Sequence, residues 1–369
     1  MMSRQETSVK PVYVIAEAGV NHNGSVDTAL ELIDAAAEAG ADAVKFQTFK
    51  SEAVISVGAP KASYQQSTTG ANESQLAMVK RLELSEDSHR LLLQHCQQRS
   101  IDFLSTPFDT VSANFLVHQL HVPQLKVPSG EITHAPFLLH IARFGLPVIV
   151  STGMSTLGEV ELALGILAYG FLNLSGIPSE SAFRDAYASD QGQDILRQRV
   201  SLLQCTTEYP ARFDQVNLRA MDTLHAAFGL PVGLSDHTPG YAIPIAATAR
   251  GATLIEKHFT LDRNMPGPDH QASLEPHELS AMIEGIRQTS AALGEGRKRP
   301  TSDEWGNRDI ARRCLVALSD VRQGELWSVD NLTCKRPGTG ISPLRYWDYL
   351  GKPANRSYLA DEILQPDPM

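Results

Sequence analysis

Short runs of β-branched and other apolar residues alternate along this sequence with stretches of helical periodicity. Neighbouring parallel strands need a long crossover between them, and a helix after each strand is the usual crossover. Eight candidate strands can be counted, at residues 12–16, 43–47, 102–104, 124–127, 147–151, 200–204, 231–234 and 254–258. Eight such units within about 290 residues predict an α/β fold, the (β/α)8 barrel, which usually needs about 250 residues before insertions.

The chain is longer than one barrel, and its composition suggests where the extra residues lie. Residues 54–70 and 170–193 are expected to be loop insertions in the barrel. The run GEGRKRPTSDEWGN is polar and broken by Gly and Pro, as linkers are. We therefore expect a barrel domain over residues 1–296, a linker over 297–308 and a small domain over 309–369. About 60 residues is near the lower limit for independent folding, so we expect the small domain to pack on a barrel.

Charge and cysteine content exclude several classes of protein. The formal net charge of the 369 residues is -10, which argues against a general nucleic-acid or anionic-membrane binder. Any anionic substrate must then be held by a local cluster of cations. The four cysteines form no C-x-x-C pair, and no apolar run approaches the roughly 20 residues of a membrane-spanning helix. We expect a reducing, cytoplasmic location.

Polar residues follow all eight candidate strands, at the end of a barrel where active sites are built. Lys45 and Lys126 are the cations of this ring. Hydroxyl groups surround them in the sequence pattern, from Thr106, Ser129, Ser151 and Ser235. Ammonium groups neutralise phosphate and carboxylate charge while hydroxyl groups orient the oxygen atoms, so this set predicts a site for a small phosphorylated acid. The alternative for each lysine alone is a charge at the rim.

Two histidines, His237 and His258, end consecutive strands. Two neutral imidazoles, completed by water or substrate oxygens, suit a divalent metal such as Mn2+, Mg2+ or Co2+ in an open catalytic shell. The alternative is that each is a buried, hydrogen-bonded histidine. Three carboxylates also lie at or near the rim: Glu17, Glu131 and Asp269. They could bind sugar hydroxyls, act as general acid and base, or pair with the lysines.

The segments that carry these residues resemble a known family. AEAGVNHNG, VKFQTFK, STPFD, KVPSGE, STGM, CTTEYP, GLSDHT, EKHFTLDRNMPGPDH and KRPGTGISP are similar, in this order, to the defining blocks of the bacterial sialic acid synthases. The resemblance spans essentially the whole chain. It implies a (β/α)8 barrel followed by a small β-rich domain like type III antifreeze protein. It also implies condensation of phosphoenolpyruvate with N-acetylmannosamine or a related N-acetylated hexose, using Mn2+ or Mg2+.

The same resemblance assigns roles to individual residues. Phosphoenolpyruvate would be held by Lys45, Thr106, Lys126, Ser129, Ser151, Thr207 and Ser235, and the metal by His237 and His258. The sugar would contact Glu17, Gln47, Tyr209 and Asp269, and Glu131 would transfer a proton. Lys45 and the two histidines would be catalytic together with Glu131. Arg336 would reach the acetamido group from the partner's small domain, which implies a domain-swapped homodimer.

Two positions depart from the family pattern. Gln204 stands where histidine is usual, and Thr207 stands where some members have asparagine. Three other functions stay open from the residues. They are an N,N'-diacetyllegionaminate synthase, whose sugar is a diacetylated dideoxyhexose, an aldolase that forms a Schiff base between pyruvate and Lys45 or Lys126, and a sugar-binding protein without chemistry. A diacetamido precursor of pseudaminic acid is a further choice of sugar.

Overall fold

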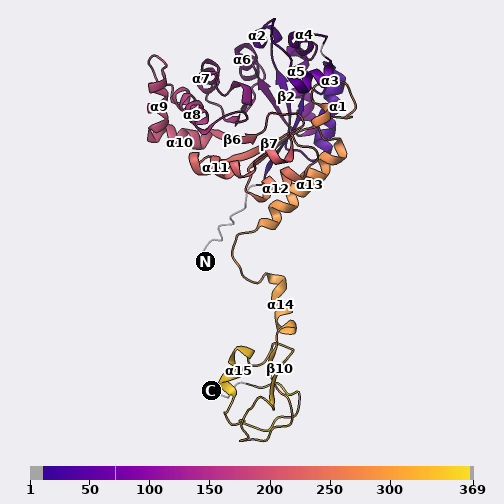
Figure 1. Cartoon of the computed structure of the whole chain (residues 1–369), viewed down its shortest axis with the longest axis vertical. Helices are drawn as coiled ribbons and strands as arrows, with labels where there is room; N and C mark the ends of the chain where they lie inside the picture. Colours follow the sequence, from indigo (N-terminus) through magenta and orange to yellow (C-terminus); the bar gives the residue numbers. More distant parts are fainter. Residues whose placement is uncertain (1–10, 71, 366–369) are drawn as a thin grey trace. The chain divides into compact units, whose positions relative to one another are not determined.

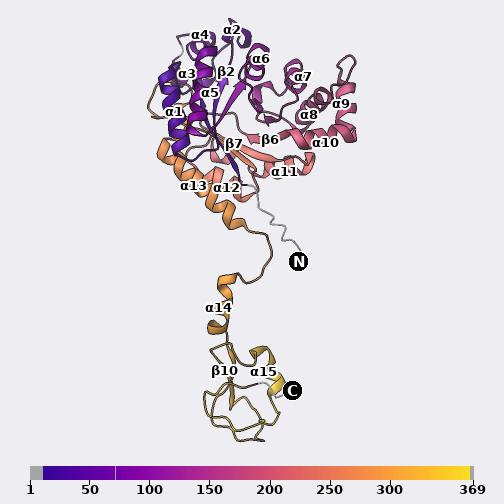
Figure 2. The same cartoon turned by 180° about the vertical axis from the view of Figure 1, so that it is seen from behind.

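The computed structural model of the chain describes residues 11–70 and 72–365. The chain forms two compact units, Met1–Gly294 and Glu295–Met369. Both units are shown from opposite sides in Figures 1 and 2.

Eight parallel strands form the centre of the first unit, with helices around them (Figure 1). They are β1 (Tyr13–Gly19), β2 (Ala43–Thr48), β3 (Asp102–Pro107), β4 (Leu125–Val127), β5 (Val148–Ser151), β6 (Val200–Cys205), β7 (Val232–Asp236) and β8 (Leu254–His258). Their hydrogen-bonded order is β3-β2-β1-β8-β7-β6-β5-β4, and the end strands β3 and β4 contact each other. The sheet is thus a nearly closed barrel, and the predicted fold class is confirmed.

At least one helix follows each strand, and one helix per strand covers the outside of the barrel. These helices are α1 (Val26–Glu38), α5 (Glu86–Arg99), α6 (Thr110–His118), α7 (Ala135–Arg143), α8 (Leu157–Phe171), α11 (Arg219–Phe228), α12 (Ala242–Ala249) and α13 (Pro276–Leu293). Side-chain caps fix where several of them begin. The Thr156 hydroxyl accepts the Glu159 amide at the start of α8, and the Glu159 carboxylate accepts the Thr156 amide in return.

Period-2 alternation along the strands determines where the polar residues lie. One apolar cluster fills the interior of the barrel and consists of Ile15, Ala43, Leu104, Ile149, Leu203 and Leu254. Two residues further along the same six strands come Glu17, Lys45, Thr106, Ser151, Cys205 and Glu256, which all line one pocket. Since residues i and i+2 of a strand share a face, the inward face is apolar at the amino ends and polar at the carboxyl ends.

Both insertions that were expected to be loops contain helices, so that expectation is wrong. The stretch 54–70 contains α3 (Ser63–Thr69), with α2 (Ser51–Val54) and α4 (Gln75–Lys80) on either side of it. The stretch 170–193 contains α9 (Glu180–Ala188) and the start of α10 (Asp190–Arg199). Among many polar residues these segments have a few apolar ones at helical spacing. Phe183 and Ala186 form the buried face of α9, and Leu196 is buried in α10. Packing of those few side chains suffices for short helices.

The second unit has its own small core. Its elements are α14 (Ser302–Ala311), the antiparallel pair β9 (Cys314–Ala317) and β10 (Leu332–Lys335), and α15 (Tyr346–Tyr349). Leu315, Trp327, Leu332 and Tyr358 are buried together in it. Helix α14 begins inside the stretch 297–308 that was expected to be a linker and continues to Ala311, and Thr301 and Glu304 cap its start reciprocally. Within residues 11–70 and 72–365, no helix is both long and apolar enough to cross a bilayer.

A buried ion pair joins the ends of β7 and β8 on the outward face. Lys257 Nζ lies 2.6 Å from Asp236 Oδ2 and also donates to the Thr238 carbonyl oxygen. The Asp236 carboxylate further accepts the amide and hydroxyl of Thr238. Asp236 and Lys257 are paired in register, and each precedes a histidine of the predicted site. The pair therefore anchors the two strand ends that carry His237 and His258.

Removing one partner of this pair should destabilise the barrel strongly. Lys257→Met leaves the Asp236 carboxylate buried and unpaired, which typically costs about 3–5 kcal/mol of unfolding free energy. Arg197→Met is the matched control, because its partner Asp194 is exposed and such pairs contribute about 1 kcal/mol or less. Urea unfolding followed by circular dichroism measures both. Equal stability of the two variants would contradict the anchoring role.

Candidate functional site

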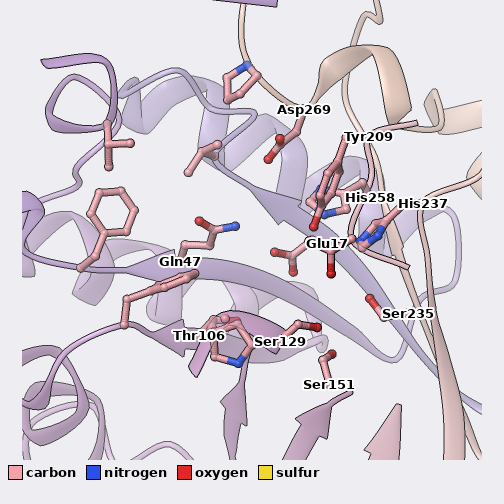
Figure 3. Close-up of a pocket in the computed structure, with 18 of the residues that line it drawn as sticks. Glu17, Gln47, Thr106, Ser129, Ser151, Tyr209, Ser235, His237, His258 and Asp269 are labelled. Atoms are coloured by element: carbon pink, nitrogen blue, oxygen red, sulfur yellow. The ribbon is translucent and has the colours of Figure 1, made fainter. Parts of the chain in front are cut away.

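A pocket of about 420 Å3 opens at the carboxyl ends of the barrel strands (Figure 3). It is lined by most of the residues that the sequence placed in the site: Glu17, Lys45, Gln47, Thr106, Lys126, Ser129, Ser151, Thr207, Tyr209, Ser235, His237, His258 and Asp269. These residues come from all eight strands or the segments that follow them. Residues up to 250 positions apart thus share one cavity because the barrel brings the strand ends together.

Two lysines and two glutamates form a buried charged cluster at the floor of this pocket. Lys45 Nζ lies 2.6 Å from Glu17 Oε2 and 3.6 Å from Glu256 Oε2. Lys126 Nζ donates to both oxygens of Glu256, at 2.8 Å each. All four side chains are almost completely buried. Each ammonium group faces a carboxylate, and these opposite charges offset the cost of burying four ionisable groups in the barrel interior.

Glu256 was the residue that sequence reasoning missed. It lies in the candidate strand 254–258, and no role was assigned to it from the sequence. The alternation along β8 was the signal that could have found it, because Leu254, Glu256 and His258 share one face of the strand. In the structure it also accepts the Ser235 hydroxyl at 2.9 Å. Glu256 thus contacts both predicted phosphoenolpyruvate lysines.

The two glutamates of the cluster differ in acidity. Burial alone would raise the pKa of Glu256, but Lys126 and Lys45 outweigh burial and hold its pKa well below the usual range. Burial raises the pKa of Glu17 to about 7, since it outweighs the attraction of Lys45 and the Glu256 charge adds to it. Burial also lowers the pKa of Lys126, despite its contact with Glu256. At neutral pH Glu256 is a permanent anion, whereas Glu17 can both accept and release a proton.

Three hydroxyl groups converge beside the cluster. Ser151 Oγ and Thr207 Oγ1 are buried and have no hydrogen-bond partner among the described residues. Ser129 Oγ accepts the amide of Gly153 at 3.0 Å. A Cβ added at Gly153 would lie 2.4 Å from Thr207 Oγ1 and 2.7 Å from Ser129 Oγ. Buried hydroxyls without partners are uncommon, and here they suit the oxygen atoms of an anionic substrate.

His237 and His258 lie side by side, with ring centroids 5.3 Å apart. His237 Nδ1 is 2.7 Å from the Thr206 carbonyl oxygen, which can only accept, so Nδ1 carries the proton and Nε2 keeps its lone pair. His258 Nδ1 is buried without a partner among the described residues, and burial holds the pKa of this ring well below its usual value. Burial would lower the pKa of His237, but Cys205 and the Thr206 carbonyl outweigh burial and raise it. His258, and His237 in its neutral form, each present a ring nitrogen that fits a divalent metal.

The chain alone offers this metal few ligands. Within the described ranges there is no group of three or more His, Cys, Asp or Glu side chains arranged to hold a metal ion. The remaining ligands of an ion at His237 and His258 would therefore be oxygen atoms of water or substrate. Such an open shell is the arrangement of a catalytic site rather than a structural one.

Two predicted sugar contacts, Tyr209 and Asp269, lie near the histidines. The Tyr209 ring centroid lies 4.1 Å from that of His237 and 5.6 Å from that of His258. Figure 3 shows Asp269 and Tyr209 on one side of the cavity, and Ser129, Ser151 and Ser235 on the opposite side. Burial raises the pKa of Asp269 to about 6. Hydroxyl-binding groups thus lie across the cavity from the groups suited to an anion.

Three positions named from the sequence lie outside this pocket. Glu131 is not among the lining residues, and its carboxylate is 2.7 Å from His134 Nδ1. Gln204 lies on the outward face of β6, between the inward residues Leu203 and Cys205, and its amide donates to the Val216 carbonyl oxygen at 3.0 Å. The departure from histidine at this position therefore does not alter the pocket. Arg336 belongs to the second unit, where it is exposed.

Comparison with known proteins follows the same division of the chain. The NeuB family matches residues 32–298, and the SAF domain matches residues 312–367. The chain belongs to the NeuB family. It is an enzyme of the sialic acid synthase type, that is, a phosphoenolpyruvate-dependent transferase that forms a carbon–carbon bond.

Several relatives of this NeuB-family enzyme match along nearly their whole length. N,N'-diacetyllegionaminic acid synthase of Campylobacter jejuni is 48% identical over 97% of this chain and 100% of its own. The synthase of the same name from Legionella pneumophila is 42% identical over 95% of this chain and 94% of its own. A crystal structure of N-acetylneuraminic acid synthetase from Leptospira borgpetersenii, in complex with citrate, is 33% identical with a TM-score of 0.64, covering 80% of this chain and 90% of that one.

A methyl group at Gly153 should weaken binding of phosphoenolpyruvate. Gly153→Ala displaces Ser129 and Thr207, and a displacement of this size should raise KM for phosphoenolpyruvate about tenfold or more. Gly158→Ala is the control, because nothing lies within 4 Å of the added Cβ there. Steady-state phosphate release measures both variants. If Gly153→Ala keeps the KM of Gly158→Ala, the hydroxyl groups do not hold this substrate.

Proposed function

We propose that this enzyme condenses phosphoenolpyruvate with the diacetylated dideoxyhexose precursor of legionaminic acid, giving N,N'-diacetyllegionaminate and phosphate. The observation that carries the chemistry is the pocket floor, where two lysines, hydroxyls without a described partner and two adjacent histidines meet. The choice of sugar is supported by the names of the 48% and 42% identical relatives. The resemblance placed N-acetylmannosamine first, and we propose the diacetylated sugar, which was the alternative, in its place.

Phosphoenolpyruvate would lie against Lys126, Ser129, Ser151 and Thr207. The lysine supplies positive charge, and the hydroxyls donate to phosphate and carboxylate oxygens. Lys45 and Thr106, which are hydrogen-bonded to each other at 2.8 Å, would adjoin the same substrate. Holding it beside the sugar converts a bimolecular step into one within a complex, which can lower the barrier by several kcal/mol.

His237 and His258 would hold a divalent metal, Mn2+ or Mg2+, with Co2+ also suited to imidazole and oxygen ligands. When bound, such an ion supplies a Lewis acid for the aldehyde oxygen of the open-chain sugar. The Thr206 carbonyl fixes the tautomer of His237. Tyr209 packs against both rings and so limits their rotation. Gln47, Asp269 and Glu17 would orient the sugar hydroxyls.

The reaction then needs charge stabilisation and a proton relay. C3 of phosphoenolpyruvate attacks the aldehyde carbon, and positive charge develops at C2. Glu256, which stays ionised, stabilises that charge. Water adds to C2 and gives up one proton, and the new alkoxide takes up a proton. The C2–O bond to phosphate then breaks, and the remaining C2 hydroxyl becomes the ketone as its proton passes to the leaving phosphate. Glu17, whose pKa is about 7, is placed for the transfer from water to the alkoxide. Glu131, assigned to it by resemblance, is paired with His134 outside the pocket.

Phosphate release against a panel of sugars tests this function. After EDTA treatment we expect no release, and after addition of Mn2+ we expect faster release with the diacetylated sugar than with N-acetylmannosamine. His237→Ala and His258→Ala should lose turnover while keeping the far-ultraviolet spectrum. His277→Ala is a suitable control, because that imidazole is 77% exposed. Metal-independent turnover would contradict the role of the histidines, and a borohydride-trapped pyruvate adduct would instead support the aldolase.

We also propose that the active unit is a domain-swapped homodimer in which Arg336 of one chain reaches the acetamido group in the other chain's pocket. Arg336 is exposed, as expected for a residue that acts on a second molecule. The same unit exposes Leu344 (88%) and Trp347 (75%). Large apolar side chains at such exposure are typical of surfaces that another protein covers.

Mixing two inactive variants tests the swap. Arg336→Ala damages only the small domain, and His237→Ala damages only the pocket. In a mixed dimer, the pocket of the first chain meets the small domain of the second, so one site is complete. After dissociation and random reassociation, about a quarter of all sites should be intact. Arg322→Ala, in the same unit, should be active by itself. No recovery on mixing would show that each chain completes its own site.

A further inference from the structure

We infer that the outer part of the pocket selects the sugar by its methyl groups. This outer part, the apolar wall, consists of Val20, Phe49, Val54, Val79, Leu82 and Phe108. It would bind the C6 methyl group and the second acetyl group of the diacetylated sugar, and it would discriminate against N-acetylmannosamine. The inference rests on the proposed function and adds the residues that decide between the two sugars.

Polarity changes along the strands from the floor of the pocket outward. On β2 and the segment after it, Lys45, Gln47 and Phe49 share one face, at roughly 3.3 Å per residue. On β3 and its extension, Thr106 and Phe108 do the same. The Phe108 amide donates to the Thr48 carbonyl oxygen at 3.1 Å, so strand pairing continues to the wall. A ligand that is charged at one end and apolar at the other matches this order.

The apolar wall is separate from the main core. Val20, Phe49 and Leu82 are buried together, with Val79 and Phe108 packed against them. The rings of Phe49 and Phe108 meet edge to face, with centroids 6.2 Å apart. All five of these residues line the pocket, so this cluster presents a surface to whatever enters it.

The wall begins next to the reacting groups. Val20 directly follows Gly19, which has a positive φ of 54°. A Cβ added at Gly19 would lie 3.3 Å from Glu17 Oε1 and 3.4 Å from His258 Cε1. Gly19 therefore lies against Glu17 and His258, and the next residue, Val20, is already part of the apolar wall. A sugar with its aldehyde at the histidines can extend directly along the wall.

Ion pairs hold the insertion that carries Val54 and Val79. Lys61 is buried, and its Nζ lies 3.2 Å from Glu73 Oε1, 2.9 Å from the Gly70 carbonyl oxygen and 3.0 Å from Thr69 Oγ1. At the base of the insertion, Glu83 accepts Lys50 Nζ at 2.9 Å and Ser51 Oγ at 3.0 Å. Helices α2 and α4 also contact each other. These contacts give the wall a defined surface.

The two sugars differ at the groups that this wall would meet. N-acetylmannosamine carries hydroxyls at C4 and C6, and an apolar surface leaves such groups without partners. The diacetylated sugar carries an acetamido group at C4 and a methyl group at C6. Its second amide also has polar partners available, because Gln65 and Gln75 line the pocket and Gln75 Nε2 lies 3.3 Å from Gln65 Oε1.

The test makes part of the apolar wall polar while keeping the shape of its side chains. Val54→Thr/Val79→Thr keeps the branched side chains and adds two hydroxyls. We expect kcat/KM for the diacetylated sugar, relative to N-acetylmannosamine, to fall about tenfold, mostly through KM for the sugar. KM for phosphoenolpyruvate should not change. Val57→Thr is the matched control, because Val57 is in the same insertion, is 83% exposed and does not line the pocket.

Each outcome decides the inference. A fall in the ratio in the double variant but not in Val57→Thr supports it. An unchanged ratio, or an equal loss with both sugars, overturns it, and the proposed function survives if the wild type still prefers the diacetylated sugar. A wild type that prefers N-acetylmannosamine overturns both. Val54→Thr alone, at a side chain that is already 37% exposed, gives the same comparison if the double variant does not fold.

Discussion

The pairing of Lys45 and Lys126 with Glu17 and Glu256 is the interaction on which the site depends. Four ionisable side chains lie inside a barrel whose interior layer nearer the amino ends of the strands is apolar. Any one of them alone would be strongly unfavourable there, so each is retained only with its partners. The consequence for an anionic substrate is competition. When the substrate binds a lysine, the ion pair between that lysine and its glutamate weakens. Hydroxyl groups and the other lysine must compensate for this loss, so binding is selective for a ligand with several correctly placed oxygen atoms.

Much of this arrangement follows from the alternation of inward and outward residues along the strands, which can be read in the sequence. The eight strands, the polar strand ends and the neighbouring histidines were all readable from apolar runs and their last residues. Side chains alternate between the inward and outward faces of a strand. Applied along each strand, this rule also places Gln204 on the outward face and Glu256 on the inward face. Glu131 was beyond such reasoning. It lies in the 3-10 turn Ser129–Glu131 after β4, where no fixed period says which way a side chain points.

The helices of the insertions were the other feature that composition concealed. Polar residues dominate both segments, so a count of residue types indicated loops. Their structure depends on a few buried side chains and on long-range ion pairs such as Lys61 with Glu73. Pairings of this kind connect residues whose proximity is created by the folded chain itself, and a single sequence contains no direct record of them.

The insertion between β2 and α5 has a consequence for how such an enzyme can change over evolutionary time. Ion pairs and hydrogen bonds tie this segment within itself and to the loop at its base, whereas the charged cluster and the histidines belong to the barrel strands. Mutations in residues 51–80 can therefore alter the outer surface of the cavity while the reacting groups keep their positions. A lineage can acquire a new sugar by remodelling one segment and inherit its carbon–carbon bond chemistry intact.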